Sequence, residues 1–267
     1  TGIKRFYFPH TGNIPILPAC ALALNPRAQI SVFEIDAHDY HSMKRRLVGY
    51  SNIEFSLGTD MNGKKGRKQA VIFCISRNTD RLLCFDILER LNKELEDGTP
   101  VYILLAKNRQ RDMIKKFNKD FSKGQVIDKT REAVLYRVLT KKSRDRWTPR
   151  FNKFEVDAIG AKLEMTTRPG VFSNSRVDVG GLALYESVDM QPGEKMLELG
   201  CGAGLVSLLT AQRMIQDKGE FSGEITVVDS CSRAIECSKI NLEDLGYEGF
   251  SVEHTELFET EEKFDLV

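Results

Sequence analysis

The sequence lacks the features that define several large classes of protein. No apolar run approaches the about 18 residues that a membrane-spanning helix requires. The stretch from Thr1 to Arg5 is not followed by the apolar segment of a secretory signal. The six cysteines, at positions 20, 74, 84, 201, 231 and 237, form no Cys-x-x-Cys pair, so neither a zinc site nor a disulfide framework is indicated. We therefore expect reduced thiols and an intracellular location, cytoplasmic or, as an alternative, mitochondrial or in another organellar matrix.

Histidine and tryptophan are also scarce. His38 and His41 lie three apart on an expected helix, but no acidic or cysteine partner completes a ligand set, so we predict surface histidines and no metal site. The only tryptophan, Trp147, lies with Pro149 in a basic stretch from Lys141 to Lys153 that has no apolar periodicity. This stretch is typical of a linker. Because the sequence begins at Thr1 instead of Met, a segment upstream of it is expected.

The sequence contains enough apolar residues for two domains, and its basic and acidic residues are divided unevenly between the two halves. It has 267 residues, of which 41% are hydrophobic and 29% are charged. Positions 1–150 carry 29 basic and 16 acidic residues, whereas positions 151–267 carry 10 basic and 22 acidic residues. The basic residues of the first half gather in the clusters Lys44–Arg46, Lys64–Lys68, Lys115–Lys116 and Lys141–Arg146. Such clusters neutralise phosphates, so we expect a polyanionic partner; two surfaces that attract each other within the molecule are the alternative.

In the first half, short apolar runs alternate with amphipathic stretches. Strands are expected at 3–8, 29–35, 53–57, 69–75 and 101–106, and helices at 16–24, 39–47, 80–96 and 112–121. Asp80 is the expected N-cap of its helix, and the segments 126–128 and 133–139 suit a closing antiparallel pair. This alternation is typical of an α/β fold with a parallel sheet covered on both faces.

The second half begins with an expected hairpin around Ile159-Gly160, with strands at 153–158 and 162–167. After it come helices at 180–188, 205–216 and 232–245 and strands at 195–199, 224–228 and 251–254. Residues 264–267 begin a further strand, inside which the sequence ends. An unfinished sheet makes an autonomous domain unexpected, so we anticipate either a truncated chain or a partner that covers the gap.

The two halves share an internal pattern. Residues 29–36 match 224–229, because in both an acidic residue closes a strand and a helix follows. Residues 53–55 and 69–73 then correspond to 250–252 and 264–267. Where the second half has a glycine-rich turn, the first half has Pro9–Asn13 with one glycine. The first half therefore resembles a copy that has lost its nucleotide loop.

The segment with the clearest chemical meaning is Glu198-Leu199-Gly200-Cys201-Gly202-Ala203-Gly204, between a strand and a helix. Glycines let the backbone turn tightly and approach a ligand. The G-x-G-x-G spacing disfavours a dinucleotide fingerprint, whose third glycine would lie one residue later. Asp229, at the end of the next strand, can accept hydrogen bonds from both hydroxyls of a ribose. A simple glycine turn with a capping acid is the alternative.

This motif resembles that of class I S-adenosylmethionine-dependent methyltransferases. The segments Pro169–Ser173 and Arg176–Gly180 narrow the resemblance to the "methyltransferase small" domain of ribosomal RNA guanine-N2 methyltransferases, which are tandem duplications whose first half has lost cofactor binding. The resemblance implies an α/β fold of two tandem Rossmann-like methyltransferase domains. Residues 1–147 would form a degenerate RNA-docking domain, and residues 148–267 a cofactor-binding domain truncated at its fourth strand.

The resemblance also implies a binding site for S-adenosyl-L-methionine. Gly200, Cys201, Gly202 and Gly204 would line its methionine and ribose portion, and Glu198 would orient the loop or reach the amino group. No histidine partner is evident for Cys201, so packing is favoured over nucleophilic work.

Further positions follow from the same resemblance. Asp229 would bind the ribose hydroxyls, with Ser230 beside the adenine. Glu256, which replaces the more usual Asp or Asn, and Leu257 match the positions that contact the adenine N6 and ring. Phe172–Ser173 would belong to a segment that closes over the active site, and a core phenylalanine followed by a helix cap is the alternative.

The catalytic residues stay unknown, because the family's Asn-Pro-Pro-aromatic motif would follow Val267. The resulting hypothesis is a methyltransferase that acts on guanine N2 of small-subunit ribosomal RNA, with ribosomal RNA or a ribosomal subunit as partner. An alternative is a non-catalytic RNA-binding subunit or assembly factor of a ribosome, organellar or otherwise. A protein or small-molecule methyltransferase is a third possibility, which would not need the basic first half.

Overall fold

The structure is a computed structural model that describes residues 2–12, 14–61, 69–107, 110–122, 124–141, 145–158, 160–246 and 248–267. The basic cluster Lys64–Lys68, residues 142–144 of the cluster Lys141–Arg146 and the hairpin residue Ile159 therefore lie outside the described residues. The chain divides into two compact units. The first comprises Thr1–Ile35 and Asp39–Pro149, and the second Asp36–His38 and Arg150–Val267.

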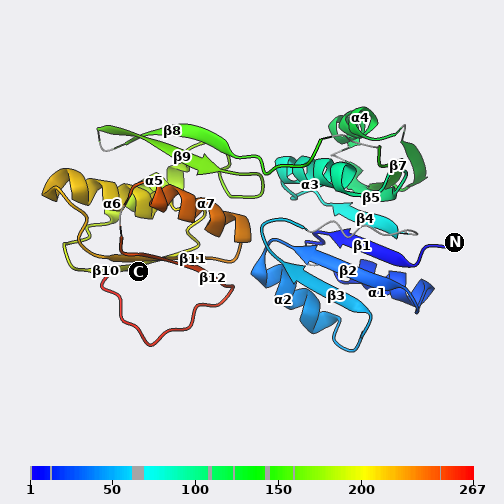
Figure 1. Ribbon diagram of the computed structural model, residues 1–267, viewed down its shortest axis with the longest axis horizontal. Coiled ribbons are helices and arrows are strands. Elements are labelled where there is room, and N and C mark those ends of the chain that lie inside the picture. Colours follow the sequence, from blue (N-terminus) through cyan, green and yellow to red (C-terminus); the bar gives the residue numbers. More distant parts are fainter. Residues whose placement is uncertain are drawn as a thin grey trace. The chain divides into compact units, whose positions relative to one another are not determined.

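The first unit is built on one seven-stranded sheet in the order β3-β2-β1-β4-β5-β7-β6 (Figure 1). Its elements are β1 (Arg5–Pro9), α1 (Ile16–Leu24), β2 (Gln29–Glu34), α2 (Ala37–Arg46), β3 (Ile53–Leu57), β4 (Gln69–Ile75), α3 (Arg81–Glu94), β5 (Pro100–Ala106), α4 (Gln110–Asp120), β6 (Gln125–Lys129) and β7 (Ala133–Leu139). Strands β1 to β5 are parallel, and β7 runs antiparallel between β5 and β6. The expected parallel sheet with a closing antiparallel pair is confirmed.

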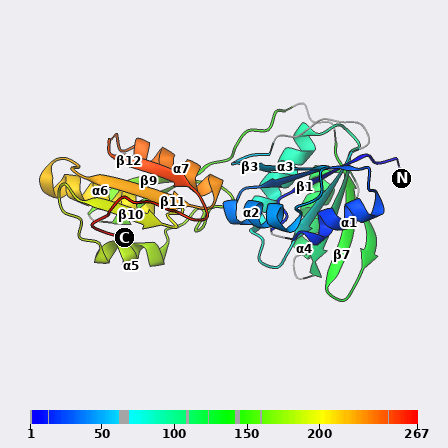
Figure 2. The same ribbon diagram turned by 90° about the horizontal axis from the view of Figure 1, so that it is seen from below.

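The strand order decides which face each helix covers. The chain moves in one direction along the sheet from β1 to β3 and in the other from β4 to β5, so right-handed crossovers place α1 and α2 on one face and α3 on the opposite face. Phe8, Ile30 and Val32 pack against Leu22 and Met43 from the two helices of the first face. Figure 2 shows β1, β3 and β7 rotated relative to one another by the sheet twist.

Helix α3 begins where its cap predicts. The Asp80 carboxylate accepts hydrogen bonds from the backbone N–H groups of Leu82, at 2.9 Å, and Leu83, at 3.3 Å. These contacts satisfy two of the donors that a helix N-terminus leaves without partners, which confirms the predicted N-cap. The helix ends at Glu94, two residues before the predicted Glu96.

The second unit combines a hairpin, three helices and a parallel sheet. Its elements are β8 (Asn152–Ala158), β9 (Ala161–Thr167), α5 (Val179–Ser187), β10 (Lys195–Leu199), α6 (Leu205–Lys218), β11 (Glu224–Asp229), α7 (Ser232–Glu243) and β12 (Phe250–His254). The parallel strands have the order β10-β11-β12, and β8 pairs antiparallel with β9. Met196 forms one parallel bridge with Leu266, on the side of β10 away from β11, where the sequence predicted a fourth strand.

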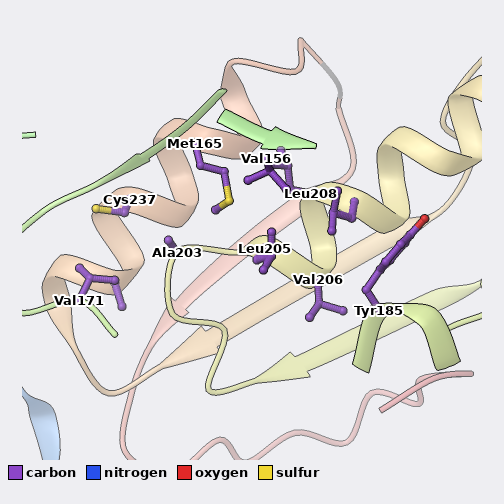
Figure 3. Packing of buried hydrophobic residues seen from close by; sticks show 11 residues of the cluster. Val156, Met165, Val171, Tyr185, Ala203, Leu205, Val206, Leu208 and Cys237 are labelled. Atoms are coloured by element: carbon purple, nitrogen blue, oxygen red, sulfur yellow. The ribbon is translucent and has the colours of Figure 1, made fainter. Parts of the chain in front are cut away.

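Helices α6 and α7 lie between the β8–β9 hairpin and the parallel sheet (Figure 1). Val156 and Met165 from the hairpin are buried in one cluster with Leu205, Leu208 and other residues of the helices (Figure 3). The hairpin alternates polar and apolar residues because only one of its faces meets this core. Its packing therefore closes one side of the second unit.

The two units repeat the same strand arrangement. Gln29 pairs with Arg5 as Glu224 pairs with Lys195, so the two registers can be superposed strand by strand. In that superposition Glu34 takes the position of Asp229, and the residues after β1 take the positions of the glycine loop after β10. The sequence pattern had placed the closing acid of the first half at Asp36, but β2 ends at Glu34.

Candidate functional site

A cavity of about 320 Å³ lies in the second unit, at the C-terminal ends of β10 and β11. The crevice beyond the carboxyl ends of parallel strands is where open α/β sheets bind ligands. Its lining residues are Phe154, Met165, Thr167, Phe172, Ser173, Arg176, Val177, Asp178, Gly180, Gly181, Leu184, Glu198, Leu199, Gly200, Cys201, Gly202, Ala203, Leu205, Val206 and Asp229. Five of the predicted site residues thus meet at one cavity: Glu198, Gly200, Cys201, Gly202 and Asp229.

The glycine loop has the backbone conformation that its residue types permit. Gly200, Gly202 and Gly204 have φ angles of 71°, 56° and 79°, which lie in the left-handed region that side chains with a Cβ rarely adopt. No atom lies within 4 Å of the Cβ that an alanine would add at Gly200 or Gly202. Backbone conformation and not crowding is therefore what requires glycine at these two positions, and the open space beside them is available to a ligand.

Helix α7 holds the loop in place from behind. The Ser238 hydroxyl donates to the carbonyl of Gly202 at 2.8 Å, and the Asn241 amide donates to the carbonyl of Ala203 at 2.8 Å. Asn241 also exchanges hydrogen bonds with the backbone N–H and C=O of Thr166 on the hairpin. Asn241 is 2% exposed, so these bonds form away from water, where an unmade bond would be costly.

Asp229 faces the loop from the neighbouring strand. One carboxylate oxygen accepts a hydrogen bond from the backbone N–H of Gly202 at 2.9 Å, and the other accepts from Cys231 at 2.7 Å. Each oxygen can accept more than one hydrogen bond, so both keep acceptor capacity toward the cavity that Asp229 lines.

Glu198 supplies a second carboxylate to the cavity. One of its oxygens accepts hydrogen bonds from the backbone N–H, at 3.1 Å, and the hydroxyl of Ser207 on α6. Burial raises the pKa of Glu198 from 4.5 to about 7; the nearby charge of Asp229 acts in the same direction, and the Ser207 hydrogen bonds oppose it. A buried carboxylate of this kind is held ready for a cationic partner, which would favour its ionised form.

The segment before α5 forms another wall. Phe172 is 75% exposed, and Ser173 and Ser175 have φ angles of 54° and 66°, which are unusual for residues with side chains. Two fully buried arginines hold the turn that precedes it: Arg233 donates to the carbonyl of Pro169 at 2.7 Å, and Arg168 pairs with Glu236. The predicted closing segment Phe172–Ser173 therefore does line the cavity.

Several lining residues were not anticipated from sequence. Phe154, Met165 and Thr167 come from the hairpin, and Arg176 and Leu184 come from the region around α5. Their only sequence signal is the alternation of the hairpin and the motif that ends in Gly180, neither of which says which face a ligand would meet.

The remaining predicted residues do not line the cavity. Gly204 begins α6, and an added Cβ there would lie 3.2 Å from the Ser238 hydroxyl oxygen, so close packing also favours glycine. Ser230 follows β11, and Glu256 and Leu257 follow β12, at the same end of the sheet as Asp229. Leu257 is 66% exposed. Their assignment to an adenine site stays a prediction.

The cysteines near the cavity are protonated at neutral pH. Burial raises the pKa of Cys201 to about 12 and that of Cys231 to about 11. A thiol must lose its proton to act as a nucleophile, so the geometry agrees with a packing role for Cys201.

The corresponding position in the first unit is filled by the protein itself. Glu34, which is fully buried, accepts hydrogen bonds from the backbone N–H of Thr11 at 2.7 Å and from its hydroxyl, and the His10 ring nitrogen lies 2.8 Å from the other oxygen. His10 and Gly12 have φ angles of 63° and 57°, close to those of Gly200 and Gly202. The loop conformation is thus kept, whereas the carboxylate is no longer open to a ligand.

One group of side chains among the described residues has the spacing of metal ligands, although the sequence predicted no metal site. It consists of His10, Glu34 and Asp39, whose ligand atoms lie within 4.8 Å of one another. The Glu34 oxygens already accept the hydrogen bonds given above, which gives the cluster a role in holding the loop.

The strand order, the glycine loop and the paired carboxylates of the second unit are features of nucleotide-binding α/β domains. Residues 162–267 match the family model of the methyltransferase small domain. In the part of the chain that the structure describes, no helix has the length and apolar character needed to cross a membrane.

The relatives are ribosomal RNA methyltransferases by name. The chain is 28% identical over 153 residues to ribosomal RNA small subunit methyltransferase C of Stutzerimonas stutzeri, which covers 57% of this chain and 44% of the relative. It is 25% identical over 171 residues to the Escherichia coli protein of the same name, covering 64% of this chain and 47% of the relative. The matched region thus spans less than half the length of these curated relatives.

A solved structure shares the fold over nearly the whole chain. The T. thermophilus 16S rRNA N2 methyltransferase, in complex with AdoMet and guanosine, matches with a TM-score of 0.76 and 17% identity, covering 98% of this chain and 69% of the other. The predicted fold of two tandem methyltransferase-like domains is confirmed by this match and by the repeated strand order.

Proposed function

We propose that the second unit binds S-adenosylmethionine in the cavity between the glycine loop and the segment Phe172–Asp178. The observation that supports this most is the pair of carboxylates, Glu198 and Asp229, on either side of a loop whose backbone leaves open space. The two carboxylate acceptors and the apolar lining fit the cofactor, which carries an ammonium group, two ribose hydroxyls and apolar surface. The solved T. thermophilus structure contains AdoMet, which adds support from the same fold.

Each residue has a defined task in this proposal. Asp229 accepts hydrogen bonds from the ribose hydroxyls, while the Gly202 N–H keeps its carboxylate in place. Glu198, held by Ser207, pairs with the ammonium group. The exposed ring of Phe172 and the side chains of Leu184 and Leu199 shield the apolar part from water. The cofactor would supply an electrophilic methyl group, and the protein would position the acceptor against it.

The acceptor that we propose is guanine N2 of small-subunit ribosomal RNA, with ribosomal RNA or the ribosomal subunit as partner. This rests on the names of the relatives and of the solved T. thermophilus N2 methyltransferase, and on the excess of basic residues in positions 1–150, which suits a phosphate backbone. The acceptor base must leave its stack to reach the cavity.

Calorimetric titration of S-adenosylmethionine tests the cofactor site. Asp229→Asn should weaken binding by about 1–3 kcal/mol, the scale of a hydrogen bond to a charged group. Asp244→Asn, at an exposed carboxylate that ends α7, is the matched control and should bind like the unmodified protein. Equal affinities for the unmodified protein and the Asp229 variant would remove Asp229 from the site, and absence of binding to the unmodified protein would end the proposal.

The alternative is a non-catalytic RNA-binding subunit of the same descent, which the closed position in the first unit also allows. An Asn-Pro-Pro motif with an aromatic residue directly after Val267 would support an enzyme, and a different sequence there would support a scaffold. A protein or small-molecule methyltransferase would instead bind RNA no worse after removal of residues 1–150.

A further inference from the structure

Strands β1, β2 and β3 of the first unit and the first residue of β4 carry polar side chains on the face away from α1 and α2. The parallel register sets these side chains next to one another: Arg5, Tyr7, Gln29, Ser31, Glu54 and Gln69. Residues paired in register point to the same side of a sheet, so all of them share one face. The alternate residues, such as Phe6 and Ile30, point to the opposite side and pack against α1 and α2. Parallel strands are normally apolar on both faces, so this polar face calls for a functional explanation.

A cavity of about 180 Å³ lies on this face. It is lined by the six polar-face residues named above together with Phe6 and Ile30. Tyr7 and Gln69 are only 6% and 7% exposed and form its buried part, whereas Arg5, Gln29 and Glu54 are exposed around it. Pockets for drug-sized ligands measure about 300–1,000 Å³, so this cavity suits a smaller group, the size of one heterocyclic ring system.

Basic residues converge on the same end of the sheet. The cavity lies where the parallel strands begin, and Lys4, Arg5 and Arg27 lie at the starts of β1 and β2. Helix α2 ends in Lys44–Arg46 just before β3, and Lys141 follows β7, whose antiparallel course brings Leu139 opposite Pro100 at the start of β5. These side chains are all exposed. Members of two basic clusters that are far apart in sequence therefore lie at the same end of the sheet as the cavity.

We propose that this cavity binds one unstacked base of an RNA strand, and that Arg5 and the surrounding basic residues contact the flanking phosphates. The inference rests on the proposed function, for which it supplies a means of RNA recognition by the first unit. The amides of Gln29 and Gln69 offer both donors and acceptors, Ser31 offers a hydroxyl, and Glu54 offers an acceptor. Such groups read the edge of a base that is free of its duplex.

The spread of basic residues over several strands distinguishes RNA from a free nucleotide. A mononucleotide has one phosphate group to place, whereas Arg5, Arg27 and Lys44–Arg46 extend over β1, β2 and the end of α2. Successive phosphates of a strand can contact all of them at once and release a counterion at each. We therefore assign the cavity to RNA and use the mononucleotide as a competitor in the test.

The test is fluorescence anisotropy of the full chain with short, end-labelled homopolymeric RNAs over a salt series. Gln29→Leu and Gln69→Leu each remove hydrogen-bonding groups with little change in volume, and should weaken binding of the preferred homopolymer about ten-fold and reduce the difference between homopolymers. Arg5→Ala should weaken all homopolymers alike and lower the slope of log affinity against log salt by about one. Gln125→Leu, at an exposed glutamine on edge strand β6, is the matched control and should change nothing.

Three results would overturn the assignment: unchanged affinity and base preference in both glutamine variants, no RNA binding by the unmodified chain, or competition by a nucleoside monophosphate as strong as that of the oligonucleotide. Because Gln29 is exposed, its variant keeps the test valid even if the buried Gln69→Leu fails to fold, and circular dichroism checks both. Titration of S-adenosylmethionine into the same variants separates the two proposals. Normal cofactor affinity with unchanged RNA binding defeats this inference alone, and absent cofactor affinity defeats the proposed function.

Discussion

Replacing Glu198 by Gln should stabilise the ligand-free protein while removing its cofactor affinity. Glu198 is held in the wall of the cavity by Ser207, and burial raises its pKa to about 7. A carboxyl group whose pKa is higher in the folded than in the unfolded chain stabilises the fold only while it is protonated. Glutamine keeps the shape and the acceptor for the Ser207 N–H but carries no charge.

The magnitude follows from the two pKa values. The difference between 4.5 and about 7, at about 1.4 kcal/mol for each tenfold change in proton affinity, corresponds to about 3 kcal/mol. In the unmodified protein this stability is fully present below pH 4.5 and is lost as the pH rises through about 7. Glu198→Gln should therefore raise the free energy of unfolding by about 2–3 kcal/mol at pH values near 8 and by little near 4.5.

The assay is urea unfolding of the ligand-free protein followed by circular dichroism at several pH values. Glu253→Gln, at an exposed position on β12, is the matched control and should leave the unfolding curves unchanged across the pH range. Calorimetric titration of S-adenosylmethionine adds the second readout. The affinity of the unmodified protein should increase as the pH rises through about 7, whereas the variant should bind weakly and without this pH dependence.

Equal unfolding free energies for the Glu198 variant and the unmodified protein near pH 8 would refute the argument, because they would show that ionised Glu198 carries no burial penalty. A variant that is stabilised but binds the cofactor normally would refute a different step. Such a result would show that ionised Glu198 does carry a burial penalty but that it does not bind the ammonium group.

Three further changes test other parts of the structure. Asn241→Leu should lower the free energy of unfolding by about 3 kcal/mol or more in thermal or urea unfolding, because it leaves the buried carbonyl of Ala203 and both backbone groups of Thr166 without partners; a loss under 1 kcal/mol would contradict this. Gly202→Ala should cost about 1–2 kcal/mol through its left-handed conformation alone, and a stability equal to the unmodified protein would show that the loop relaxes. Glu34→Gln should destabilise the protein yet leave calorimetric cofactor affinity unchanged, and reduced affinity would give the first unit a part in cofactor binding.

Much of the fold follows from the sequence because local patterns and tertiary packing agree. The strand at 195–199 has three apolar residues out of five, and the glycines after it permit the left-handed backbone that Gly200 and Gly202 adopt. Asp80 precedes an amphipathic helix and caps it. In these places the residue type suits one local conformation better than most other residues do, so the sequence indicates that conformation.

The parts that sequence reasoning missed depend on register and on contacts between distant segments. Whether Thr167 or Arg176 reaches the cavity depends on how the hairpin packs over α7, which alternation alone does not tell. The polar face of β1 to β3 is invisible in sequence for a related reason. Arg5, Gln29 and Gln69 are separated by long stretches of chain, and only the parallel register brings them together.

The contrast between Glu34 and Asp229 shows how a unit can keep its fold after its binding site has been lost. Both carboxylates end the second parallel strand of their unit and face a loop of the same backbone conformation. Asp229 takes hydrogen bonds from backbone N–H groups and stays open to a ligand, whereas Glu34 is surrounded by the side chains of Thr11 and His10. A binding site needs acceptors that the protein leaves partly unsatisfied, and a stable core needs the opposite. Placing side chains in the loop after the first strand thus satisfies the carboxylate, stabilises the unit and removes the site in one step.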